Sequence, residues 1–139
     1  INAWGQDNKS VATRTVVESP SLTRVEQRTG GADANPYLLI AATLAGGLYG
    51  IENELTFEAP ISGDAYTKRV ERSVPSTIDD ALQRFEQSDI AKRYLGEEFV
   101  RFFALTRRHE WSLFAALPDA DLTSGEVTQW ELERYFEFV

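Results

Sequence analysis

The fold is decided by residues 11–28, which read VATRTVVESPSLTRVEQR. β-Branched side chains dominate residues 11–17, and a second short run of strand-forming residues follows at residues 22–28. Between these runs, residues 18–21 (Glu-Ser-Pro-Ser) are of the types that favour turns. The pattern therefore predicts a β-hairpin that ends before the glycine-containing stretch at residues 29–34.

A hydrophobic helix is predicted directly after the hairpin, at residues 36–51. Asn35 can accept the free backbone N–H groups of its first turn, and Pro36 needs no hydrogen-bond acceptor at the first helical position. Residues 38–48 are apolar apart from one threonine, so we expect this helix to be buried on all sides. The glycines within residues 46–50 suggest that another backbone packs closely against it.

The rest of the chain is predicted to be mostly helical, except for residues 52–75, which show little periodicity. Polar residues that suit a helix N-terminus precede each apolar run in this part of the chain. Helix starts are predicted at Ser76–Thr77, at Asp89, at Glu97 and at Thr123 or Ser124. The predicted class is therefore α+β, with a β-hairpin followed by several helices.

Length and composition describe about one globular domain. The chain has 139 residues, of which 42% are hydrophobic and 26% charged, so a disordered or fibrous protein is excluded. Its net charge of −8 does not favour nucleic acid or an anionic membrane as a partner. With no cysteine and one histidine, the sequence has no disulfide, thiolate zinc site or histidine-rich metal site. Because methionine is absent even from position 1, we expect the chain to be a piece of a longer protein.

Positive charge is concentrated near the start of the chain. Residues 1–30 hold four basic and three acidic side chains, whereas the remaining residues hold ten basic and nineteen acidic ones. Arg24, Glu26 and Arg28 alternate along the second strand, so their side chains share one face. A carboxylate between two guanidinium groups could hold a divalent metal while the arginines bind phosphate or carboxylate oxygens. A solvated strand face with alternating charges is the ordinary alternative, and these residues alone favour it.

Other polar groups are less specific. The segment Trp4–Lys9, followed by Arg14, could place polar side chains across the hairpin, but a surface turn with a packed tryptophan is the simpler interpretation. Asn8-Lys9-Ser10 fits the glycosylation sequon, which often arises by chance. For His109, in a charged helical segment, we expect a solvated or salt-bridged side chain rather than a catalytic base. The sequence contains neither a Walker A phosphate loop nor a G-x-G-x-x-G dinucleotide motif.

Several short segments follow one another in a specific order along the chain. They are Trp4-Gly5-x-x-Asn8-Lys9, Arg14, Arg24-Val25-Glu26-Gln27-Arg28, Gly31-Ala32-Asp33-Ala34-Asn35-Pro36-Tyr37, the helix ending in Ala-Gly-Gly-Leu-x-Gly, Val74-Pro75-Ser76-Thr77 before Ala81-Leu82, and Trp130-Glu131 before Tyr135. In this order they resemble the end of the glutamine synthetase catalytic domain. The chain is thereby expected to be a C-terminal fragment of such a domain over residues 1–139, with active-site residues in 1–30 and mostly helices in 31–139.

The resemblance implies an ATP-dependent ligase that joins ammonia or an amine to the γ-carboxylate of glutamate through γ-glutamyl phosphate. ATP and Mg²⁺ or Mn²⁺ would be its cofactors. Glu26 matches a metal-ligand glutamate of the family, and Arg28 matches the arginine that meets glutamate and the transferring phosphoryl group. Arg14 and Arg24 match residues around the nucleotide phosphates. Lys9 stands where the family usually has a catalytic arginine, and lysine lacks the planar fork for bidentate contacts.

Three interpretations stay open. The parent protein is a glutamine synthetase, a ligase of a polyamine or another amine, or a catalytically silent helical interaction module on the same scaffold. The resemblance implies a cytoplasmic homo-oligomer built as a double ring, whose remaining metal ligands and glutamate flap lie upstream. We therefore expect the chain alone to be inactive, and we expect no nucleic-acid or membrane partner.

Overall fold

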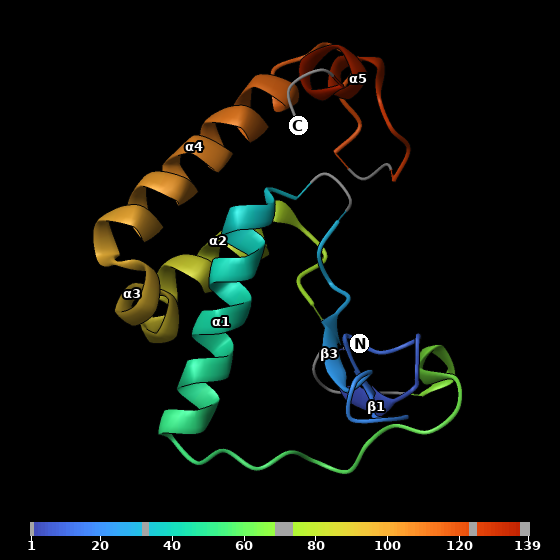
Figure 1. Cartoon of the computed structure of the whole chain (residues 1–139). Helices are drawn as coiled ribbons and strands as arrows, with labels where there is room; N and C mark the ends of the chain where they lie inside the picture. Colours follow the sequence, from blue (N-terminus) through green and yellow to red (C-terminus); the bar gives the residue numbers. More distant parts are fainter. Residues whose placement is uncertain (1, 32–33, 69–73, 123–124, 137–139) are drawn as a thin grey trace. The chain divides into compact units, whose positions relative to one another are not determined.

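The computed structural model has the predicted α+β arrangement, with a small sheet followed by helices (Figure 1). It describes residues 2–31, 34–68, 74–122 and 125–136. Its elements, in chain order, are β1 (Trp4–Gln6), β2 (Thr13–Val16), β3 (Arg24–Gln27), α1 (Pro36–Glu52), the 3₁₀ helix η1 (Ala65–Thr67), α2 (Ile78–Gln87), α3 (Asp89–Leu95), α4 (Glu97–Ala115) and α5 (Gln129–Tyr135).

Two compact units make up the chain. The first unit comprises residues 1–32 and 46–75 and contains the sheet, and the second comprises residues 33–45 and 76–139 and contains α2 to α5. Helix α1 begins in the second unit and ends in the first.

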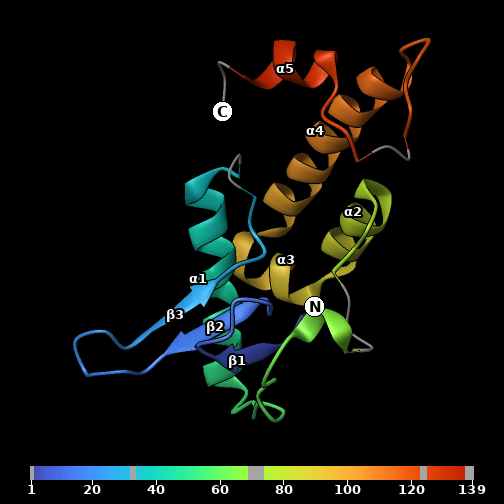
Figure 2. The ribbon, with the colours of Figure 1, turned by 90° about the vertical axis from the view of Figure 1, so that its right-hand side faces the viewer.

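The predicted hairpin forms the main part of the first unit. Strands β2 and β3 are antiparallel, with Thr13 opposite Gln27 and Val16 opposite Arg24. A third strand, β1, lies where the sequence favours a surface turn, and it pairs with β2 in parallel, giving the order β1-β2-β3 (Figure 2). Three residues are too few to show an alternating pattern, so only the tertiary contacts reveal this strand.

An irregular segment, residues 58–65, completes the first unit by lying along β1. The Ile61 amide donates to the Trp4 carbonyl at 2.9 Å, and the Trp4 indole N–H donates to the Glu58 carbonyl at 2.7 Å. At the end of this segment, Ala65 is fully buried. The backbone of residues 58–65, rather than a periodic apolar face, makes these contacts. This explains why residues 52–75 show little hydrophobic periodicity in the sequence.

Helices α2, α3 and α4 pack together in the second unit. The N-caps of α2 and α3 lie at or next to the predicted positions. Thr77 accepts the Asp80 amide at the start of α2, and Ser88, one residue before the predicted Asp89, caps α3. Leu82 and Val100 are among the most buried side chains of this unit. Polar caps and a shared apolar face therefore stabilise this part of the chain.

The last helix, α5, begins later than predicted. Thr128 caps it with a complete capping box, in which its side chain accepts the Glu131 amide and Glu131 accepts the Thr128 amide. The predicted caps Thr123 and Ser124 lie outside the described residues. The sequence offers the spacing of a capping box twice, in Thr123 with Glu126 and in Thr128 with Glu131, and the helix begins at the second.

Helix α1 begins as predicted but is not buried on all sides. Asn35 Oδ1 accepts the Tyr37 and Leu38 amides at 3.0 and 3.2 Å. Of the α1 residues only Ala45 is buried, and Leu44 is 61% exposed. A Cβ atom added at Gly46 would meet no atom within 4 Å, so no other described backbone packs there. None of the helices in the described part of the chain is long and apolar enough to cross a membrane.

The glycine at position 5 gives a test of this fold. A Cβ atom at Gly5 would lie 2.6 Å from the Ile61 carbonyl oxygen and 2.9 Å from the Asn8 Cβ atom. We expect Gly5→Ala to lower the free energy of unfolding of the first unit by about 1–3 kcal/mol, because backbone must shift. Gly46→Ala is the matched control and should instead stabilise α1 by about 0.5–1 kcal/mol. Urea titrations followed by NMR signals of β2 and α1 measure both effects, and equal effects of the two variants would contradict this packing.

Candidate active site

Three arginines converge on one carboxylate of the hairpin. Arg14 and Glu26 are direct register partners, and Arg14 Nη1 donates to the two Glu26 carboxylate oxygens at 3.0 and 3.2 Å. Arg24 contacts the same carboxylate through Nε at 3.0 Å and Nη2 at 2.9 Å, and Arg28 Nη1 lies 3.9 Å from it. The predicted row of Arg24, Glu26 and Arg28 is therefore present, and Arg14 joins it from β2.

These contacts favour the ionised form of Glu26. The hydrogen bond from Arg14 is the largest cause that lowers the pKa of the Glu26 carboxyl, and Arg24 adds to it against the opposing effect of burial. The hydrogen bond to Asp7 is the largest cause that raises the pKa of the Arg14 guanidinium, and the hydrogen bond to Glu26 is the second largest. About a quarter of the Glu26 side chain, 26%, is exposed. The cluster is thus fully charged and still reachable from solvent.

Asp7 is a member of this cluster that the sequence analysis did not select, because it preferred a surface turn for residues 4–9. Its carboxylate pairs with Arg14 Nη2, and its backbone has a φ of +53°, a left-handed conformation that aspartate tolerates better than most residues. Arg14 is held between Asp7 and Glu26, and its Nε–H is buried without a hydrogen-bond partner among the described residues. The turn-forming character of the Gln6-Asp7-Asn8 stretch was the available signal, and it specifies no partner.

Lys9 meets the cluster through its main chain. Arg28 Nε donates to the Lys9 carbonyl oxygen at 3.2 Å, and the Arg28 amide donates to the Ala12 carbonyl at 2.8 Å. The Lys9 side chain itself is exposed. The structure therefore brings all five sequence-predicted site residues into one region of the first unit.

The cluster carries the charge for an anionic ligand. The three arginines and Lys9 supply four positive charges, against two negative charges from Asp7 and Glu26. Guanidinium groups with this arrangement suit phosphate oxygens, and the buried Arg14 Nε–H has no hydrogen-bond partner among the described residues.

A divalent metal fits the described residues less well. They contain no group of three or more acidic, histidine or cysteine side chains that could hold one. Glu26 could supply one carboxylate, but its oxygens already accept hydrogen bonds from Arg14 and Arg24. A metal here would need its other ligands from elsewhere.

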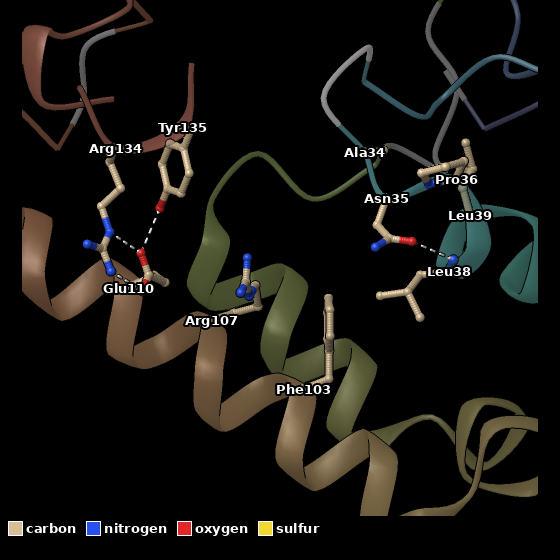
Figure 3. Close-up of a pocket in the computed structure, with 10 residues that line it drawn as sticks. All are labelled: Ala34, Asn35, Pro36, Leu38, Leu39, Phe103, Arg107, Glu110, Arg134 and Tyr135. Atoms are coloured by element: carbon tan, nitrogen blue, oxygen red, sulfur yellow. Dashed lines mark hydrogen bonds and ion pairs between the residues drawn. The ribbon is translucent and has the colours of Figure 1, made fainter. Parts of the chain in front are cut away.

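A second charged cluster lies in the second unit, beside an open cavity of about 990 Å³ (Figure 3). Arg134 donates twice to Glu110 at 2.7 Å, and the Tyr135 hydroxyl donates to the same carboxylate at 3.0 Å. Led by the hydrogen bond from Arg134, these contacts lower the pKa of Glu110 to about 2. The pairs join α5 to α4, so this cluster has a structural role. His109, next to Glu110 in sequence, is exposed and does not line the cavity.

The family of the chain is shown by comparison with known proteins. The family model for the glutamine synthetase catalytic domain matches residues 1–135, and the chain therefore belongs to this family. Type-1 glutamine synthetase 2 of Dictyostelium discoideum is 41% identical over 98% of this chain. A glutamate–isopropylamine ligase of Pseudomonas sp is 36% identical over 99%, and a γ-glutamylethanolamide synthetase of Streptomyces coelicolor is 41% identical over 97%.

The chain spans about a quarter of the length of these curated relatives. The matched regions are 25%, 28% and 27% of the three proteins, in the order given above. The predicted family is thus confirmed.

The Glu110 cluster predicts a pH dependence of stability. The pKa of this carboxyl in the folded chain is about 2, below its ordinary value of 4.5. Its stabilising contribution is therefore fully present above about pH 4.5 and is lost as the pH falls towards 2. In the unchanged chain the unfolding free energy should decrease as the pH falls from about 4.5 towards 2, and in Glu110→Gln we expect this decrease to be smaller. Glu133→Gln, which removes one acidic charge from α5, is the control. Parallel curves for Glu110→Gln and the unchanged chain would contradict the assignment.

Proposed function

We propose that this chain supplies the arginine cluster of the active site in an ATP-dependent carboxylate–amine ligase that forms a γ-glutamyl amide. The observation that carries the proposal is the convergence of Arg14, Arg24 and Arg28 on Glu26, in a chain that belongs to the glutamine synthetase family. In the proposed reaction a γ-carboxylate oxygen of glutamate attacks the γ-phosphorus of ATP, the bond from that phosphorus to the β–γ bridging oxygen breaks, and ADP leaves. The amine then attacks the carbonyl carbon of γ-glutamyl phosphate, phosphate leaves, and the amine loses a proton.

The arginines have different surroundings, which suit different roles. Arg14 is held between two carboxylates and is only 15% exposed, which suits a fixed charge near the nucleotide phosphates. Arg24 is 49% exposed, which leaves it free to contact those phosphates as well. Arg28, just past the end of β3, is 36% exposed and lies 3.9 Å from Glu26, which suits a cation that faces a substrate. A preorganised cation at that point stabilises negative charge that develops during phosphoryl transfer.

Glu26 and Lys9 have proposed roles that depend on groups outside the described residues. We retain Glu26 as one ligand of a Mg²⁺ or Mn²⁺ ion, which would neutralise phosphate charge when bound. Lys9 would add a point charge near the transferred phosphoryl group. The inactivity of the chain alone, the double-ring assembly of the parent and its cytoplasmic location also stay part of this proposal.

A second candidate concerns the amine that is ligated. Two of the three relatives described above are named as ligases of isopropylamine and ethanolamine-type substrates, not of ammonia. Lysine at position 9 also departs from the usual arginine of glutamine synthetases. A parent that ligates a larger amine is favoured over the silent interaction module, because Arg14, Arg24 and Arg28 are all present and lie against Glu26. Parallel assays of the parent with ammonia, putrescine and ethanolamine would identify the substrate.

Arg28 gives the most direct test of the site in the full-length parent. We expect Arg28→Ala to lower the turnover number by about 10²–10³, because a preorganised cation is removed from developing charge. Arg84→Ala is the control, since Arg84 makes an exposed ion pair with Asp80 within α2 and should leave turnover unchanged. Turnover close to that of the unchanged enzyme in Arg28→Ala would remove Arg28 from the proposed site.

Glu26 is tested by its metal dependence. If it ligates a metal, Glu26→Ala should raise the Mg²⁺ or Mn²⁺ concentration needed for half-maximal activity by about tenfold or more, and high metal should restore part of the turnover. If Glu26 only holds the arginines, added metal will restore nothing. A metal titration of both proteins, with circular dichroism as the folding control, separates these outcomes.

A further inference from the structure

The side chain of Asn8 uses its complete hydrogen-bonding capacity. Its Nδ2 group donates to the Ile61 and Gly63 carbonyls, each at 2.9 Å. Its Oδ1 atom accepts the Ser10 amide at 2.9 Å and the Ser10 hydroxyl at 2.6 Å. An asparagine amide offers two donors and two acceptor lone pairs, so all four are satisfied here. A side chain bound in this way is not available for glycosylation, although Asn8-Lys9-Ser10 fits the sequon.

These bonds tie the turn after β1 to a part of the chain more than fifty residues away. Asn8 binds the backbone of residues 61–63, and the Ser10 hydroxyl accepts the Ala65 amide at 2.9 Å. Ala65 is fully buried and Gly5 is in close contact with Ile61, so the attachment point is packed and not a mobile surface. The turn is therefore held from both sides of Lys9, by Asn8 and by Ser10.

Lys9, which lies between Asn8 and Ser10, makes the contact to Arg28. The Lys9 carbonyl accepts the Arg28 Nε–H at 3.2 Å, and this is the hydrogen bond by which the turn holds the Arg28 side chain. The direction of that carbonyl depends on the conformation of the turn, which Asn8 and Ser10 determine. The side chain at position 9 takes no part in this contact, so lysine can replace arginine there without changing it.

We propose that Asn8 is a positioning residue that sets the Arg28 guanidinium through the Lys9 carbonyl. Asn8 does not contact the reacting groups in this assignment, and its role in catalysis rests on the proposed function. An error of about 1 Å in the position of a substrate-binding group can cost about 10²-fold in rate. We therefore expect Asn8→Ala to lower the turnover of the parent ligase by about 10–100-fold.

A double-mutant cycle in the full-length parent distinguishes positioning from general destabilisation. If Asn8 acts through Arg28, Asn8→Ala should reduce turnover strongly in the unchanged enzyme but by less than about twofold in the Arg28→Ala background. Asn53→Ala is the matched control, because its Nδ2 group also donates to a backbone carbonyl, that of Tyr49 at 2.8 Å, at the exposed end of α1. An equal reduction by Asn8→Ala in both backgrounds would overturn the proposal.

A measurement without catalysis keeps the two proposals separate. In the 139-residue chain, we expect Asn8→Ala to speed exchange of the Arg28 Nε–H proton with water by about tenfold or more, as seen by NMR, because its acceptor is displaced. Ser10→Ala is a milder second variant in case Asn8→Ala fails to fold, and it should act in the same direction. Unchanged exchange in a folded variant would overturn the positioning role. Faster exchange together with an inactive parent would instead contradict the proposed ligase function alone.

Discussion

The first unit depends on the ionised carboxylate of Glu26 and the three guanidinium groups around it. Arg14 reaches this carboxylate from the neighbouring strand, and Arg24 and Arg28 reach it along β3. Without a negative charge at this point, three cations would face one another on one side of the hairpin, which is costly at partial burial. The carboxylate therefore allows the positive charges of the proposed anion-binding site to be assembled in a chain whose net charge is −8.

The site is supported by parts of the chain that are far apart in sequence. The turn after β1 holds Arg14 through Asp7 and holds Arg28 through the Lys9 carbonyl. The same turn is fastened to residues 61–65 by side-chain-to-backbone hydrogen bonds. An arginine has a long and flexible side chain, so its usefulness in binding a phosphoryl group depends on such supports. The irregular segment after α1 thus supports the proposed site through its backbone.

Helix α1 places a different constraint on the molecule. Its side chains are almost entirely apolar, yet most of the large ones are exposed, including Ile40, Leu44 and Ile51. A monomer rarely leaves so much apolar surface in contact with water. This surface agrees with a chain that spans only about a quarter of the length of its curated relatives. The structure also shows why an apolar sequence alone does not establish burial. Burial requires another segment that packs on the side chains, and no described segment covers Ile40, Leu44 and Ile51.

The sequence by itself determined the elements whose signals are local. Turn residues between two strand-forming runs predicted the hairpin, and Asn35 and Pro36 predicted the start of α1. The alternation of Arg24, Glu26 and Arg28 placed these side chains on one face. Only the tertiary structure decided what depends on long-range contacts: strand β1, the pairing of Asp7 with Arg14, and the four hydrogen bonds of Asn8. The physical reason is that periodicity and capping act within a few residues, whereas a hydrogen bond to a backbone carbonyl more than fifty residues away leaves no pattern in the sequence.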